Sequence, residues 1–186
     1  MTMRWTEFIR LLGCTAMAVT LAACGGRDNN DAPAQSQAAP PTAEAAIAQL
    51  ENSGAIPKLD RSASLAGPDA DGNGVRDDID AYINGKFTDG KQRKAVLQDA
   101  RAMQKAVLVD ATDKVAAKTV SLRLMDSTSC LFSVFPDGAG LTSPESVSRK
   151  IEAITSNTKS RLKAYLAYNK SLDGSVGSLP IGDTCE

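Results

Sequence analysis

The chain has no histidine among its 186 residues. Histidine is the usual general base near neutral pH and a frequent zinc ligand. Its absence excludes Ser–His–Asp and Cys–His catalysis as well as histidine-bound zinc. Gly-rich phosphate loops and G-x-S-x-G motifs are absent too. We therefore expect a protein that is not an enzyme, although lysine- or carboxylate-based chemistry is left open.

Aromatic residues are also scarce, at 4% of the chain, although apolar residues make up 42%. This composition favours a small core of Ala, Leu and Val packed between helices over a β-sandwich, which uses more aromatic and β-branched residues. The formal net charge of −1 gives no basic footprint for nucleic acid. The composition therefore predicts an all-α domain with no nucleic-acid partner.

The only long apolar run lies near the N-terminus. Arg4 and Arg10 precede the run Leu11–Ala23, which has the length of a signal peptide and is shorter than the roughly 20 residues of a membrane span. It ends in Leu21-Ala22-Ala23-Cys24, which resembles the lipobox of bacterial lipoproteins. The resemblance implies cleavage after Ala23 and acylation of Cys24, for example with palmitate. The alternative is an ordinary secretion signal that leaves Cys24 as a free thiol.

The lipoprotein resemblance also implies a location and a division of the chain. Gly25 follows the cysteine in place of the Asp that retains enteric lipoproteins in the inner membrane. We therefore expect lipid anchoring in the cell envelope, at the outer membrane and facing the periplasm. Residues 1–23 would be the signal peptide, and residues 24–41, rich in polar residues, Ala and Pro, a disordered tether. Residues 42–186 would form the helical domain, and the chain as a whole resembles small bacterial lipoproteins.

A stretch rich in aspartate, residues 69–80, has the spacing of a calcium loop. Calcium takes six to eight oxygen ligands, and a 12-residue loop supplies them at positions 1, 3, 5, 7, 9 and 12. Gly74 stands at the sixth position, where the chain turns sharply. The expected ligands of Ca²⁺ are Asp69, Asp71, Asn73, Val75 through its backbone carbonyl, Asp77 and Asp80.

The loop resembles the EF-hand-like calcium loops of dockerin modules and thrombospondin type 3 repeats. It departs from a sensor EF-hand in two ways. Asp80 stands where a bidentate Glu is usual, and Gly67-Pro68 cannot continue an incoming helix. The resemblance implies a single structural calcium site with only the outgoing helix. The alternative is a solvated acidic turn, because Asp, Asn and Gly are common in turns.

Apolar spacing predicts the helices of the domain. We expect a helix over 42–53 with Thr42 as N-cap, and another over 77–87 that buries Ile79, Tyr82, Ile83 and Phe87. One long helix, capped by Thr88 or Asp89, should run to residue 126, although a bend near Asp110–Asp113 is an alternative. A loop over 127–142 and a last helix over 144–170, capped by Ser143, should follow. The two long helices would pack as an antiparallel hairpin.

The first half of the long helix is basic. A run of charge is usually a solvated face, and contact with an anionic lipid or an acidic partner is the functional alternative. The basic side chains are Lys91, Arg93, Lys94, Arg101 and Lys105.

Two of the four cysteines should form a disulfide. The lipobox resemblance implies that Cys14 leaves with the signal peptide and that Cys24 is lipidated, which leaves Cys130 and Cys185 in an exported chain. Their cross-link would close a loop of about 55 residues and stabilise the fold by about 4 kcal/mol.

The sequence favours a non-enzymatic cell-envelope lipoprotein with a structural calcium site, which binds another envelope protein or a polymer. One alternative is a periplasmic inhibitor or immunity lipoprotein that inserts residues 127–142 into its target. A less favoured alternative is a carboxylate-based hydrolase. Its acids would come from Asp126, Glu145 and Glu152.

Overall fold

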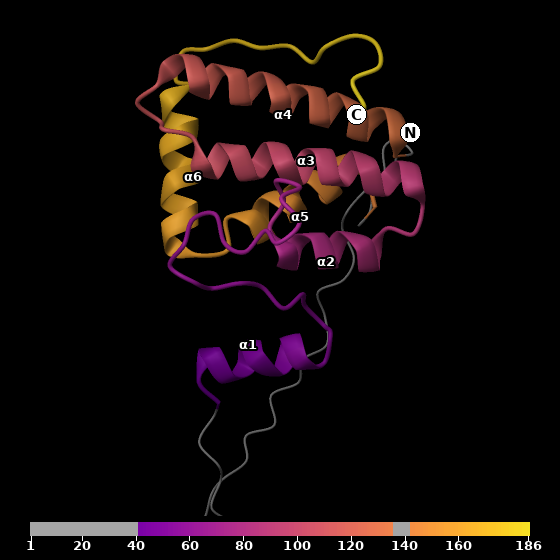
Figure 1. The fold of residues 1–186 in the computed structure, drawn as a ribbon, viewed down its shortest axis with the longest axis vertical. Coiled ribbons are helices and arrows are strands. Elements are labelled where there is room, and N and C mark those ends of the chain that lie inside the picture. The colour runs from indigo at the N-terminus through magenta and orange to yellow at the C-terminus, as the bar shows by residue number, and fades with distance from the viewer. Residues whose placement is uncertain (1–40, 136–141) are drawn as a thin grey trace, which may run out of the picture. The chain divides into compact units, whose positions relative to one another are not determined.

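The computed structural model describes residues 41–135 and 142–186 (Figure 1). These residues form six helices and no strand, as the all-α prediction requires. The helices are α1 (Ala43–Asn52), α2 (Asp77–Lys86), α3 (Gly90–Leu108), α4 (Lys114–Val134), α5 (Pro144–Thr155) and α6 (Lys159–Ser171). Cys24, the expected signal peptide and nearly all of the expected tether lie outside the described residues. No helix of the described part combines the length and apolarity that crossing a membrane requires.

Helix α3 packs against four other helices, α2, α4, α5 and α6. It runs beside α4 in the opposite direction (Figure 1). The main core is built from α2 to α5, and a smaller cluster around Tyr168 joins α3, α4 and α6. Both clusters lie within one unit, Pro41–Glu186, which therefore carries its own core. The fully buried apolar side chains include Ile79, Ile83, Val96, Ala100, Leu131 and Ile151.

Several predicted helix ends are confirmed, each by a side chain that accepts backbone N–H groups. Thr42 accepts from the N–H of Ala45, and Asp89, the second of its two candidates, accepts from the first turn of α3. Ser143 caps α5, with Pro144 in its first turn. Ser, Thr and Asp are favoured at this position because they satisfy N–H groups that have no partner in the helix.

The prediction of one long helix over 89–126 is wrong, because the chain breaks between α3 and α4. Asp110 accepts hydrogen bonds from both the N–H and the hydroxyl of Thr112. Asp113 then accepts from the N–H groups of Val115 and Ala116 and starts α4. Local side-chain acceptors thus compete with the helical hydrogen bonds over these residues.

The predicted loop over 127–142 is also wrong, because α4 continues to Val134. The hydroxyls of Thr128 and Ser133 donate to carbonyls four and three residues earlier. A stretch rich in Ser and Thr can therefore stay helical without leaving its hydroxyls unsatisfied. Leu131 and Phe135 are buried as expected, but from a helix and its C-cap. Residues 136–141 lie outside the described part.

The predicted last helix, 144–170, is two helices, α5 and α6. The side chain of Thr158 caps α6 by accepting from the N–H of Arg161. Ser156 donates its hydroxyl to Glu152, and Asn157 bonds the carbonyl of Asp60. The expected pairing of two long helices is therefore wrong as well, and the closely packed pair is α3 with α4.

The break before α4 also shifts which side chains face the core. Val115 and Leu122 continue the apolar spacing of the predicted long helix, so they should face the core, yet they are 77% and 52% exposed. The buried residues of α4 are Ala117, Val120, Ser127, Cys130 and Leu131. A pattern counted through an interruption loses its phase, because the residues between two helices do not turn by 100° each.

Candidate metal site

Three of the predicted ligands converge at the start of α2. Asp69, Asp71 and Asp77 each offer a carboxylate oxygen, and these atoms all lie within 4.8 Å of one another. All three side chains are exposed. The N–H of Asp77 donates to the carbonyl of Pro68 at 2.9 Å, which closes the base of the loop. This group of acids could hold a metal ion, since exposed carboxylates at this separation offer the oxygen ligands of a hard cation.

Two glycines give the loop its tight path. Gly74 has φ +81°, as its place in the motif predicted, and Gly72 has φ +67°. Only glycine adopts these left-handed conformations without strain. The turn at Gly74 lets its N–H donate to Asp69 Oδ2 at 3.0 Å, and the N–H of Asn73 donates to Asp69 Oδ1 at 3.1 Å. The backbone thus fixes the orientation of the first carboxylate.

The other three predicted ligands lie around this group with different neighbours. Asn73 donates its side-chain amide to Asp71 Oδ2 at 3.0 Å, and its own Oδ1 accepts from the N–H of Val75. Val75 has its side chain in the main core. Asp80 accepts from the amide of Asn84 at 3.1 Å. The structure thus brings Asp69, Asp71 and Asp77 together most closely, and it anchors the seventh position of the loop in the core.

The charges of the loop repel one another when no cation is bound. Burial raises the pKa of Asp80, and the negative charges of Asp71, Asp77 and Asp69 raise it further. A bound divalent cation would relieve this repulsion, because it favours the ionised carboxylates. The donor set is all oxygen, which suits Ca²⁺ or Mg²⁺ better than a metal that prefers nitrogen or sulfur.

A buried arginine that the sequence analysis did not single out holds the loop against the core. Arg76 is 1% exposed and forms a two-pronged ion pair with Asp78, at 2.6 and 2.9 Å. Its guanidinium also donates to the carbonyls of Ile154 and Thr155 at the end of α5. Arg76 therefore links the loop to α5 and satisfies carbonyls that the helix leaves free.

A second buried arginine, Arg161 on α6, holds the segment before the loop. It pairs with Asp60 at 2.6 Å and donates to the carbonyls of Ser64 and Leu65. Its hydrogen bond to Asp60 lowers the pKa of that carboxyl to about 2. The N–H of Asp60 in turn donates to Asp78 at 2.6 Å. The two arginines thus form one network that positions the chain entering the candidate site.

Gly67 is required where this network meets the loop. Its φ is +70°, and a Cβ on it would collide with the side chain of Arg76. In the sequence, Gly67-Pro68 indicated only that no helix enters the loop. The Gly67 position was thus predictable as a turn, but its contact with a buried arginine was not.

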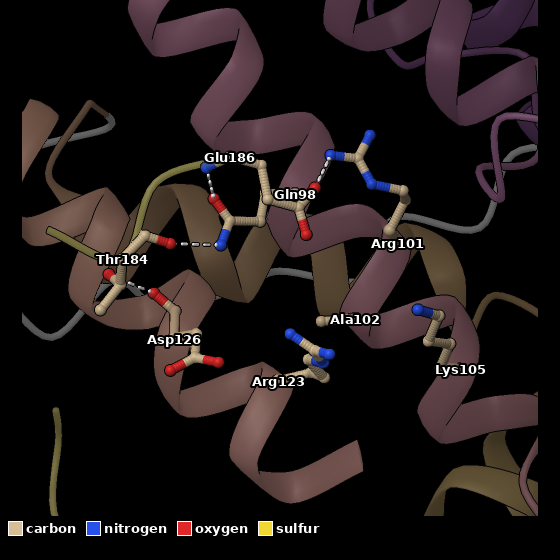
Figure 2. A pocket seen from close by; sticks show the side chains of 8 residues that line it. All are labelled: Gln98, Arg101, Ala102, Lys105, Arg123, Asp126, Thr184 and Glu186. Carbon is tan, nitrogen blue, oxygen red and sulfur yellow. Dashed lines mark hydrogen bonds and ion pairs between the residues drawn. The ribbon is translucent and has the colours of Figure 1, made fainter. Parts of the chain in front are cut away.

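The predicted disulfide between Cys130 and Cys185 is present, with Cα atoms 5.0 Å apart. It fixes the tail, residues 172–186, onto α4. Gln98 on α3 holds the same segment, because it donates to the carbonyl of Thr184 and accepts from the N–H of Glu186 (Figure 2). The tail is thus attached at a covalent and a hydrogen-bonded point.

The acids considered for a hydrolase lie on two helices, Asp126 on α4 and Glu145 and Glu152 on α5. Among the described residues, the only group of three or more acidic, Cys or His side chains with ligand atoms within 4.8 Å is that of Asp69, Asp71 and Asp77. Asp126 lines a small cavity beside α3, Glu145 is exposed in the first turn of α5, and Glu152 lies further along α5.

Comparisons with protein-family models, with curated proteins and with solved structures find no match to this chain.

Proposed function

We propose that the chain is a non-enzymatic lipoprotein of the cell envelope, anchored through Cys24, whose helical domain is stabilised by Ca²⁺ and binds another envelope protein. The convergence of Asp69, Asp71 and Asp77 supports the calcium site. The calcium ligands would be these three carboxylates together with Asn73, the carbonyl of Val75 and Asp80. The lipid anchor rests on the lipobox motif, and its place at the outer membrane rests on Gly25.

Calcium would act here as a structural ion. The loop leads directly into α2, which buries Ile79 and Ile83. The segment before the loop is held by the ion pair between Arg161 and Asp60. An ion that neutralises the repelling carboxylates would therefore stabilise the junction between the loop and the core. An ion that binds only the folded chain stabilises it by RT ln(1 + [L]/Kd).

The test is a thermal melt of residues 41–186 with Ca²⁺ and with a chelator. At a free concentration of about 100 Kd, calcium should add about 2.7 kcal/mol and raise Tm by several degrees. The variant Asp69→Ala/Asp71→Ala should lose this increase. The control Glu44→Ala/Asp173→Ala removes two exposed acids elsewhere and should keep it. A parent protein with no calcium response would leave the loop as an acidic turn.

The lipid anchor has its own test in the full chain. Cys24→Ala removes the thiol that the lipobox motif assigns to acylation. The protein should therefore lose metabolic labelling with palmitate and leave the membrane fraction. Labelling separates acylation from retention of an uncut signal peptide, which would also hold the protein on membranes. Palmitate labelling that persists in Cys24→Ala would contradict the assignment.

A further inference from the structure

One face of α3 is basic and open to solvent. Positions 94, 97, 101, 105 and 108 follow one another by three or four residues and therefore share a face. They carry Lys94, Leu97, Arg101, Lys105 and Leu108. Lys94 and Lys105 are exposed, Leu108 is 47% exposed, and Leu97 and Arg101 are partly buried. Helix α3 contributes no acid to this face, because its single acid, Asp99, is buried.

Two hollows meet on this face at Arg101. The first is a cavity of about 60 Å³ between α3, α4 and the tail (Figure 2). Arg101, Lys105 and Arg123 line it, with Asp126 and Glu186 as its acids. The second is a shallow hollow of about 280 Å³, lined by Lys94, Leu97, Arg101 and Glu186. Because Arg101 and Glu186 line both hollows, the two are neighbours, and together they are called the α3 groove.

The groove already holds one carboxylate from the chain itself. Glu186 forms an ion pair with Arg101, and its N–H is held by Gln98 (Figure 2). The disulfide holds the tail in place beside it. Lys94, Lys105 and Arg123 have no ion pair among the described residues, although they lie on the same groove. Unpaired cations around a hollow favour an anionic ligand, and arginine matches the planar carboxylate with its fork of N–H donors.

We infer that the α3 groove binds an acidic peptide segment of a partner protein, next to the carboxylate that Glu186 supplies. This inference rests on the proposed function, which includes an envelope protein as partner, and it names the surface and the chemistry. From Lys94 to Leu108 the helix rises about 21 Å, the length of roughly six extended residues. The cations of this face lie among two leucines, Leu97 and Leu108, which suits a segment in which acidic and apolar residues are mixed.

The test is fluorescence anisotropy with a labelled six-residue peptide of glutamate and leucine, added to residues 41–186 at low ionic strength. Binding should be saturable and should weaken at least tenfold in Lys105→Glu/Arg123→Glu. The control Lys163→Glu/Lys170→Glu changes the net charge equally on α6, outside the groove, and should bind nearly as the parent does. Equal weakening in both variants, or no binding to the parent, would overturn the inference. If the reversal unfolds the chain, Lys105→Gln/Arg123→Gln repeats the test.

Two further measurements, one on a Glu186 variant and one on lipid vesicles, test the same groove. Glu186→Gln removes the intramolecular competitor at Arg101 and should strengthen peptide binding several-fold. Vesicles of anionic phospholipid that bind through Lys105 and Arg123, while the peptide does not, would overturn the inference in favour of a membrane surface. Each titration is run with calcium and with chelator. If the peptide binds but calcium does not raise Tm in the thermal melt, the groove is supported and the metal site is refuted. If calcium raises Tm but the peptide does not bind, only the groove is refuted.

Discussion

Asp99 is a carboxylate with no exposure to solvent, on the helix that packs against most of the others. Its Oδ1 accepts from the hydroxyl of Ser127 at 2.8 Å, while its Oδ2 has no hydrogen-bond partner among the described residues. Burial raises its pKa to about 6, although the nearby hydroxyls of Ser127 and Ser148 lower it in part. A buried acid that is only half satisfied lowers stability when it is ionised.

Asp99→Asn should therefore change how stability depends on pH. The ordinary pKa of an aspartate is 3.8, so between about pH 4 and 6 folded Asp99 keeps a proton that the unfolded chain has released. The free energy of unfolding then falls as pH rises through this window, by up to about 3 kcal/mol. Asparagine does not titrate, so the variant should lack this fall and be more stable than the parent at pH 7.

Urea denaturation from pH 4 to 8 measures this difference between parent and variant. Asp60 does not contribute to the change in the free energy of unfolding between pH 4 and 8. Its pKa is lowered to about 2, so its titration lies below this window. Stability from Asp60 is present above about pH 4 and is lost as pH falls towards 2, which is the opposite sign. Parallel curves for parent and Asp99→Asn would show that Asp99 does not titrate as proposed.

At the residue scale, the sequence predicted the side chains whose role is set by local spacing. Gly74 and the carboxylates of the candidate site follow from a 12-residue pattern, and the caps Thr42 and Ser143 from their neighbours. Arg76 and Arg161 could not be found in this way. Arg76 has one near partner, Asp78, but the carbonyls that bury the two arginines lie on α5 and in the segment 60–65, far away in sequence. Local sequence therefore does not separate them from solvated arginines.

At the scale of elements, α1 differs from the other helices because it buries none of its residues. Ile47 and Leu50 share one face of this helix by their spacing, but they are 38% and 46% exposed. It is linked to the following segment through Glu51, which accepts from the N–H of Leu59 and pairs with Arg61. An amphipathic pattern thus predicted the helix correctly, but it did not establish that the helix packs on the core.

Matched substitutions on two helices of ten residues test this difference. Ile47→Ala on α1 removes a side chain that is already partly in water, so it should change the free energy of unfolding by less than about 0.5 kcal/mol. Ile79→Ala on α2 empties a site that is 0% exposed and should cost about 2 to 5 kcal/mol. Urea denaturation of residues 41–186 measures both. Equal losses would mean that α1 packs on another surface in solution.

Boundaries between helices were harder to predict than their existence. The breaks at 109–113 and 156–158 contain no Pro or Gly, and each is made by side chains that hydrogen-bond locally, such as Asp113 and Thr158. The same residue types also occur inside α4, where Thr128 and Ser133 donate to carbonyls of their own helix. Which role such a residue takes is decided by packing around it, and that information is not in the local sequence.

At the scale of the whole molecule, the tail is held on the helices by one disulfide and by hydrogen bonds. Residues 172–186 have no helix, and Val176 and Ile181 are 90% and fully exposed. The disulfide joins residues 55 positions apart, and Thr184 and Glu186 are bonded to α4 and α3 beside it. The lipobox resemblance implies that Cys14 and Cys24 are not available for a disulfide, and on that basis it predicted the pairing of the other two cysteines. Nothing in the sequence indicated that the tail would reach α3.

Cys130→Ala/Cys185→Ala should therefore lower the free energy of unfolding and also strengthen peptide binding to the α3 groove. Closing a loop of about 55 residues restricts the unfolded chain, so its loss should cost up to about 4 kcal/mol in the free energy of unfolding. The freed tail should also withdraw Glu186 from Arg101 and strengthen peptide binding, as Glu186→Gln does. Urea denaturation and anisotropy measure the two effects, and chemical reduction of the parent is the control that leaves side-chain volumes unchanged. Stronger peptide binding with unchanged stability would mean that the tail covers the groove without supporting the core. Lower stability with unchanged peptide binding would mean that Gln98 alone keeps Glu186 in place.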